Sequence, residues 1–180
     1  MHERLLQSLE HTPGVDDWRL RRTVSTSTQY YLARREPENA RSARSERLEV
    51  EVYNDPPAAR DGAPSRGLAS LTLLPGEEAA IDRRIEQAVF MAGLTDNPPF
   101  SLPGPAVYPQ MLIADRILEV EPARVARELA GQLLEAMDRE PGVSLASAEF
   151  FVDRHEVTLQ NSRGARGEAT GTTLLLDFVL

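Results

Sequence analysis

Residues 23–32 read TVSTSTQYYL, a run dominated by β-branched and aromatic residues. Such residues fit the pleated surface of a sheet and are poor helix formers. The run predicts the centre of a long strand over residues 17–33. One face of that strand mixes apolar and polar side chains, namely Leu20, Val24, Tyr30 and Leu32 with Arg22, Thr26 and Thr28. We therefore expect a strand that faces solvent over much of its length.

Two hairpins are predicted from the segments on either side. A charged turn at residues 34–39 leads into a partner strand over 41–53, in which apolar and charged residues alternate. A second hairpin pairs residues 146–160 with 166–180 around the turn Asn161-Ser162-Arg163-Gly164. A short strand is predicted over residues 67–74.

Helices are predicted where apolar residues recur every three or four positions, over residues 3–10, 77–92 and 122–138. Pro122 suits a first helical turn, and Pro141-Gly142 ends that helix. Loops are predicted over residues 54–65, which are rich in Pro, Gly and Asp, and over 97–109, which hold five prolines.

Together these elements predict an α+β fold in which long antiparallel β-hairpins form a curved sheet packed with about three helices. A helix precedes each hairpin, and this recurrence predicts an internal duplication of a helix-plus-hairpin unit. The predicted halves are residues 1–95 and 111–180, joined by a Pro-rich connection over 96–110. All of residues 1–180 are assigned to one domain.

Composition narrows the class of function. The chain has 180 residues and a net charge of −8, which disfavours binding to nucleic acid or to an anionic membrane surface. It has no Cys, so disulfides and thiolate metal sites are excluded. No stretch approaches the ~20 apolar residues of a membrane span, and we expect a cytoplasmic protein.

The last nine residues read TTLLLDFVL, an apolar strand with no polar tail. Chain ends are usually polar and frayed. We therefore expect either a docked terminal strand or a polypeptide cut from a longer protein.

Candidate chemical groups are few. His155-Glu156 lacks the second His of a zinc-protease helix, so no metal site is predicted. Asp153 and His155 share a strand face, which allows a Ser-His-Asp relay, although a solvated polar pair is the preferred interpretation. The glycines of the second hairpin lack the Lys of a phosphate-binding loop. The many Arg residues of the first hairpin alternate with Glu, which indicates exposed ion pairs.

The order of elements, the stretch Pro98-Pro99-Phe100-Ser101-Leu102-Pro103 and the Asn161-Ser162-Arg163-Gly164 turn resemble the N-terminal domain of TldD/PmbA metallopeptidases, also called modulators of DNA gyrase. In that family the zinc-binding His-Glu-x-x-x-His helix lies beyond this domain. The resemblance therefore implies a non-catalytic fragment, with no cofactor in this chain and zinc in the missing catalytic part.

The resemblance further implies a bacterial or archaeal peptidase system that acts on small or unfolded peptides. It also implies a homo- or heterodimer with a partner of the same family, in which this domain helps to form the substrate chamber. We hypothesise that the first hairpin and the Pro-rich segment line the peptide path, with Ser25, Ser27, Gln29, Tyr31, Phe100 and Ser101 as the lining residues.

Two other functions stay open. The chain is alternatively a stand-alone interaction or regulatory module of the DNA gyrase modulator type, without peptidase activity. A free-standing, metal-independent hydrolase that uses Asp153 and His155 is the third.

Overall fold

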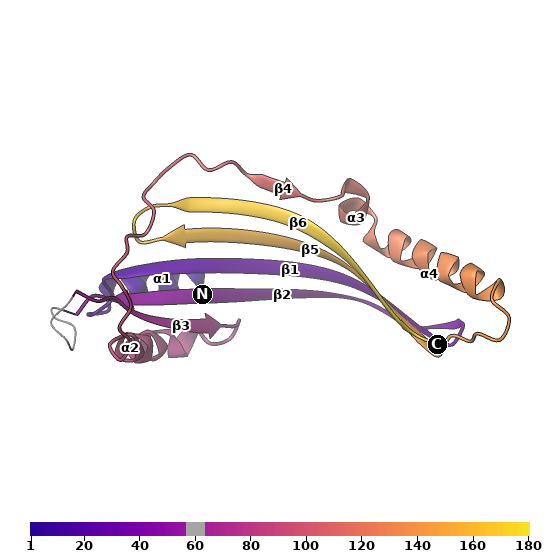
Figure 1. The fold of residues 1–180 in the computed structure, drawn as a ribbon, viewed down its shortest axis with the longest axis horizontal. Helices are drawn as coiled ribbons and strands as arrows, with labels where there is room; N and C mark the ends of the chain where they lie inside the picture. The colour runs from indigo at the N-terminus through magenta and orange to yellow at the C-terminus, as the bar shows by residue number, and fades with distance from the viewer. Residues whose placement is uncertain (57–63) are drawn as a thin grey trace. The chain divides into compact units, whose positions relative to one another are not determined.

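The computed structural model describes residues 1–56 and 64–180. The strands form a six-stranded sheet in the order β3-β2-β1-β5-β6-β4, and Figure 1 shows β1, β2, β5 and β6 as long strands side by side. The strands are β1 (Asp17–Ala33), β2 (Glu36–Asn54), β3 (Gly67–Leu73), β4 (Met111–Ile113), β5 (Ser147–Asn161) and β6 (Arg166–Val179). Both predicted hairpins are therefore confirmed.

The helices are α1 (His2–His11), η1 (Glu78–Ala80), α2 (Ile81–Ala92), α3 (Arg116–Val120) and α4 (Pro122–Asp138). The α+β class is confirmed, and α1, α2 and α4 match the predicted helices. None of the helices in the described part of the chain is both long and apolar enough to cross a membrane.

Some boundaries differ from the prediction. The turn of the first hairpin is shorter than residues 34–39, because β2 already begins at Glu36. Arg34 takes the left-handed conformation with φ of 57°, which lets the chain reverse within two residues. The predicted loop over residues 54–65 falls largely on residues 57–63, which lie outside the described residues.

Two short elements were not predicted. β4 pairs in parallel with β6, matching Met111 with Ala169 and Ile113 with Gly171. The helix α3 starts at an N-cap, where the Asp115 carboxylate accepts a hydrogen bond from the amide of Ile117 at 2.7 Å. Asp115 before Ile117 was the available signal, but five helical residues are too few to show a period.

The chain packs as two compact units, each of which takes parts of both hairpins. Unit 1 comprises residues 1–23, 46–110 and 157–168, and unit 2 comprises 24–45, 111–156 and 169–180. The internal duplication and the linear division at residues 95 and 111 stay predictions.

In unit 1, α1 and α2 cover one face of the sheet. The core joins Leu5 and Leu9 of α1, Ile81 and Ile85 of α2, and the inward residues of the strands: Trp18, Leu20, Leu48, Val50, Val52 and Leu73. The alternation of Leu48, Val50 and Val52 with charged residues thus has the predicted orientation.

In unit 2, α4 supplies the apolar cover. Ala126 and Ala130 are its buried residues, and their small side chains lie among Leu32, Ala148, Phe150 and Val152. The predicted stripe of larger residues, including Leu129, Leu133 and Met137, is only partly buried at the margin of this cluster.

Candidate functional site

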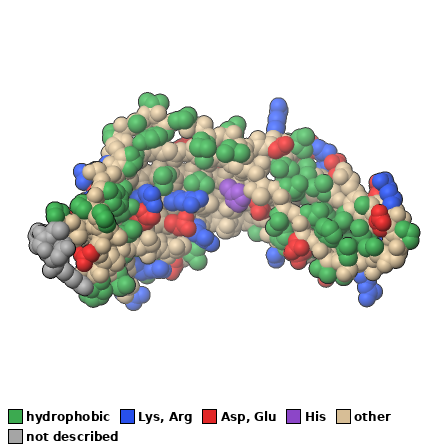
Figure 2. Space-filling view, in the orientation of Figure 1, with side chains coloured by type: hydrophobic (Ala, Val, Ile, Leu, Met, Phe, Trp, Pro, Cys, Tyr) green, Lys and Arg blue, Asp and Glu red, His purple; other side chains and the backbone are tan. Residues whose placement is uncertain are grey.

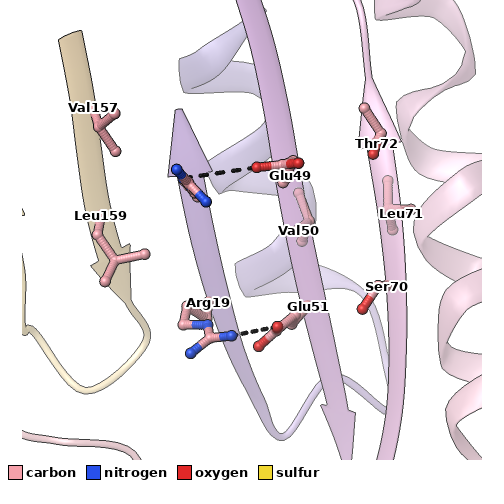
Figure 3. A pocket seen from close by; sticks show the side chains of 10 residues that line it. Arg19, Glu49, Val50, Glu51, Ser70, Leu71, Thr72, Val157 and Leu159 are labelled. Carbon is pink, nitrogen blue, oxygen red and sulfur yellow. Dashed lines mark hydrogen bonds and ion pairs between the residues drawn. The ribbon is translucent and has the colours of Figure 1, made fainter. Parts of the chain in front are cut away.

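A groove of about 610 Å³ lies on the sheet of unit 1. Its charged side chains belong to strand positions that alternate with core residues, so they lie on the face away from α1 and α2. We call it the unit 1 groove; Figure 3 shows its lining residues, which are Arg19, Arg21, Glu49, Val50, Glu51, Ser70, Leu71, Thr72, Val157 and Leu159.

Ion pairs cross the floor of the unit 1 groove. The guanidinium of Arg19 donates to Glu51, and Arg21 lies 3.8 Å from Glu49. The hydrogen bond to Glu51 raises the pKa of Arg19 above its ordinary value. Figure 2 shows blue and red side chains next to one another on the visible face. The groove therefore offers paired charges, as the alternation of Arg and Glu indicates.

Glu51 is held from a second side. The hydroxyl of Tyr53 donates to its carboxylate at 2.5 Å. Burial raises the pKa of Tyr53 to about 12, and the neighbouring Glu51 adds to the shift. Two donors fix the Glu51 carboxylate, so this charge of the floor is held in place by the fold itself.

The walls of the unit 1 groove differ from each other. Val157 and Leu159 of β5 form an apolar wall whose side chains point towards β1 (Figure 3). Ser70 and Thr72 of β3 supply hydroxyls on the opposite side. Hydroxyls, paired charges and aliphatic groups are the contacts that an extended polypeptide can use, and the arrangement is suited to binding.

The Asn161-Ser162-Arg163-Gly164 turn is hydrogen-bonded to β1 and to the Pro-rich segment, and we call this set of contacts the anchor. The side chains of Ser162 and Arg163 donate to the Asp17 carboxylate at 2.6 and 2.7 Å. Asn161 donates to the carbonyl of Pro103 at 2.9 Å. The turn therefore ties β1 and the Pro-rich segment to the second hairpin, which gives the motif a structural role.

Arg66 completes this anchor. It is only 4% exposed and donates to Asp17 at 2.8 Å and to Asp55 at 2.6 Å. Burial alone would raise the pKa of Asp17, but its hydrogen bonds from Arg163, Ser162 and Arg66 outweigh burial and lower it. Asp17 is therefore held as a buried carboxylate.

Phe100, one of the predicted path residues, belongs to the same cluster. The Arg66 guanidinium lies 5.3 Å from the Phe100 ring centre and 5.4 Å from that of Tyr53. Phe100 is 47% exposed, and Ser101 beside it is also exposed. Both residues lie in unit 1, where they can still meet a ligand.

The other four predicted residues lie in unit 2. Gln29 donates to Ser27 at 3.0 Å and accepts from Tyr31 at 2.7 Å. The Arg41 guanidinium donates to Gln29 at 2.6 Å and lies over the Tyr31 ring. We call Ser27, Gln29, Tyr31 and Arg41 the β1 ladder. The structure brings these side chains together, while their role in a peptide path stays a prediction.

Ser25 contacts a different partner. Its hydroxyl lies 2.9 Å from Nδ1 of His155. A hydrolytic relay also needs an acid that orients the imidazole. Asp153 does not fill this position, because its buried Oδ1 has no hydrogen-bond partner in the structure. Ser25 and His155 therefore form a hydrogen-bonded pair that lacks the acid of a catalytic relay.

No group of three or more His, Cys, Asp or Glu within residues 1–56 and 64–180 could hold a metal ion. None of the six predicted path residues lines the unit 1 groove, and its hydroxyl and apolar wall residues, Ser70, Thr72, Val157 and Leu159, were not predicted as a site. The hairpin pattern placed each of them on a strand, but it contained no signal for which strands become neighbours.

Comparison with models of protein families gives no match, and comparison with curated proteins gives none either. Solved structures do match. TldE from Thermococcus kodakarensis shares 19% identity with a TM-score of 0.69, over 98% of this chain and 38% of that chain.

Two further structures are described as a "putative modulator" of DNA gyrase. The one from Thermotoga maritima has 12% identity and a TM-score of 0.65, over 98% of this chain and 39% of that chain. The one from Bacteroides thetaiotaomicron has 16% identity and a TM-score of 0.65, over 97% of this chain and 38% of that chain.

This chain thus spans less than two fifths of the length of the structures that it matches. Identities of this size establish the fold alone. The chain has the fold that TldE and these two proteins contain within their longer chains, and the resemblance seen in the sequence is confirmed at that level.

Proposed function

We propose that this chain is the non-catalytic, polypeptide-guiding part of a TldD/PmbA-like zinc metallopeptidase of the bacterial cytoplasm. The observation that carries the proposal is the structural match to TldE, which covers 98% of this chain but 38% of that protein. In this proposal the catalytic zinc belongs to a further part of the parent, and the enzyme degrades small or unfolded peptides.

The unit 1 groove supports a guiding role. Its paired charges present little net charge to a ligand, and its apolar wall and hydroxyls do not select a single side chain. A surface of this kind suits many peptide sequences better than one small molecule. Phe100 and Ser101 supply further contacts in unit 1, and the β1 ladder supplies polar and aromatic contacts of its own in unit 2.

The proposal includes a dimer with a homologous or identical subunit, in which this part helps to enclose the substrate chamber. Ile117 and Val120 of α3, both more than half exposed and about one helical turn apart, support such an assembly, because adjoining exposed apolar side chains often belong to protein interfaces.

A second candidate is a regulatory module of the DNA gyrase modulator type without peptidase activity. The descriptions of the Thermotoga and Bacteroides structures favour it. In that case the partner is a protein surface, because a net charge of −8 opposes direct binding to DNA.

Peptide binding separates the two candidates. Fluorescence anisotropy with labelled, unstructured peptides should show saturable binding to this chain. Replacing Leu159, an apolar wall residue of the unit 1 groove, by Glu should weaken that binding. The matched variant Leu94→Glu, at an exposed position outside the groove, should not.

The gyrase alternative is tested by DNA supercoiling. Under the guiding proposal, addition of this chain leaves the rate of supercoiling by gyrase unchanged. An altered rate together with no peptide binding would reject the guiding role in favour of the regulatory module.

A further inference from the structure

The outer edge of β6 is paired over only part of its length. β4 pairs with residues Ala169 to Gly171. Beyond Gly171, no strand in the described part of the chain pairs with this side of β6. From Thr172 to Val179 the strand therefore presents a row of backbone donors and acceptors that can pair with another strand.

The side chains along this free edge are apolar and exposed. Their exposed fractions are between 39% and 59%, for Leu174, Leu175, Leu176, Phe178, Val179 and Leu180. Consecutive residues of a strand point to opposite faces, so apolar groups are exposed on both faces. Strands with this pattern are usually covered on both sides.

β4 shows what chemistry the edge accepts. Its three residues, Met111, Leu112 and Ile113, are apolar, and between 53% and 69% of each is exposed. They are held on β6 by strand pairing in parallel register. The Asp115 amide then donates to the Thr172 hydroxyl at 2.9 Å, and the chain leaves the edge into α3. The free edge therefore continues a pairing surface that already holds an extended apolar segment.

Charge favours a foreign segment over a second copy of this chain. Asp177 is the one charged residue between Thr172 and Leu180, and the whole chain has a net charge of −8. A second copy would bring another Asp177 and the same net charge. A basic residue opposite Asp177 would instead be stabilised across the strands.

We propose that β6 binds an extended, apolar polypeptide segment that carries one basic residue, which adds to the edge between Thr172 and Val179 as a further strand next to β4. The inference rests on the proposed peptide-guiding function and adds its binding mode and preferred substrate. Main-chain hydrogen bonds supply the affinity, and Asp177 supplies a preference for a cationic side chain.

The test uses a fluorescein-labelled nonapeptide of valine and threonine with a central lysine, and the same peptide N-methylated at alternate residues. N-methylation removes backbone donors and leaves the side chains in place. We expect the unmodified peptide to bind and the N-methylated peptide to bind at least about tenfold more weakly, because several main-chain hydrogen bonds to β6 are lost.

Charge reversal tests the register. Asp177→Lys should weaken binding of the lysine peptide by up to about fivefold, and a glutamate peptide should restore it. The control Glu135→Lys makes the same charge change at an exposed position on α4 and should alter neither affinity.

Equal affinity for the unmodified and the N-methylated peptide would overturn binding by strand addition, but it would not contradict the peptide-guiding function. Binding of neither peptide would reject both. A dimer whose crosslinks join residues 172–179 of one copy to the same residues of the other, and which saturating lysine peptide does not dissociate, would overturn the proposal and assign the edge to a second copy.

Discussion

The Arg66 guanidinium donates to the Asp17 carboxylate at 2.8 Å, and both residues are buried. Removing one member of a buried ion pair leaves an uncompensated charge in a medium that solvates it poorly. Asp17→Ala should therefore lower the free energy of unfolding by about 3–5 kcal/mol. Urea denaturation monitored by Trp fluorescence measures this change in the free energy of unfolding.

The control for Asp17 is an exposed pair. Asp138 lies 2.7 Å from Arg35, and more than half of each side chain is exposed. Asp138→Ala should change stability by less than about 1 kcal/mol. Similar losses in both variants would show that burial does not set the strength of the Asp17 pair.

Tyr53 should ionise at a higher pH than an ordinary tyrosine. Its pKa in the folded chain is about 12, raised first by burial and then by its hydrogen bond to Glu51. Absorbance titration should show one of the four tyrosines ionising about two pH units after the ordinary value near 10.

The raised pKa of Tyr53 also predicts a loss of stability at high pH. The neutral phenol is favoured in the folded chain, so the contribution is complete below pH 10 and is lost as pH rises towards 12, by up to about 3 kcal/mol. Tyr53→Phe should reduce this pH dependence. An unchanged slope in the variant would assign the loss to other groups.

His2 predicts a dependence of the opposite kind. Burial lowers its pKa below 6.5, and Arg22 and Arg166 act in the same direction, against Glu46 and Glu3. The neutral form is favoured on folding. The stability is therefore present above pH 6.5 and is lost as pH falls through 6.5 to the lowered pKa.

NMR titration of the His2 ring would measure this shift. Its Nε2 lies 3.1 Å from the amide nitrogen of Gln160. Gln160→Glu should therefore raise the pKa of His2, because a carboxylate at this position favours the charged ring. If the pKa of His2 does not respond to this change, the contact between His2 and Gln160 of β5 is not formed in solution.

Two glycines should respond oppositely to Ala. A Cβ at Gly131, within α4, meets no atom within 4 Å, and Gly131→Ala should stabilise the fold by about 0.5–1 kcal/mol. A Cβ at Gly67 would lie 2.1 Å from the carbonyl oxygen of Ala92, so Gly67→Ala should be destabilising. Thermal unfolding of both variants measures the contrast, and two shifts of the same sign would contradict it.

The long elements could be predicted because their patterns repeat. β1 was predicted at its observed bounds, since the β-branched and aromatic run over residues 23–32 lies between the Pro13-Gly14 turn and the charged turn that follows Ala33. β4 could not be found, because three apolar residues carry no period and its pairing with β6 depends on a distant segment.

The candidate site was less predictable for the same reason. Ser27, Gln29 and Tyr31 alternate along one strand, so the sequence places them on one face, while Arg41 joins them from β2. Their place in a peptide path stays a prediction. The unit 1 groove needs β5 beside β1 and β3 beyond β2, and no local pattern specifies that order. The anchor at Asp17 likewise joins groups 146 residues apart.

That separation has a consequence for biosynthesis. Asp17 leaves the ribosome early, but its partners Ser162 and Arg163 follow near the end of the described chain. Contacts between such distant residues form slowly, because a long loop must close first. Translation must therefore pass residue 163 before unit 1 can complete its anchor, and β1 lacks its neighbour β5 until residues 147–161 have been made. During that interval the open edge of β1 can pair with other polypeptides, so misassembly competes with folding of the nascent chain.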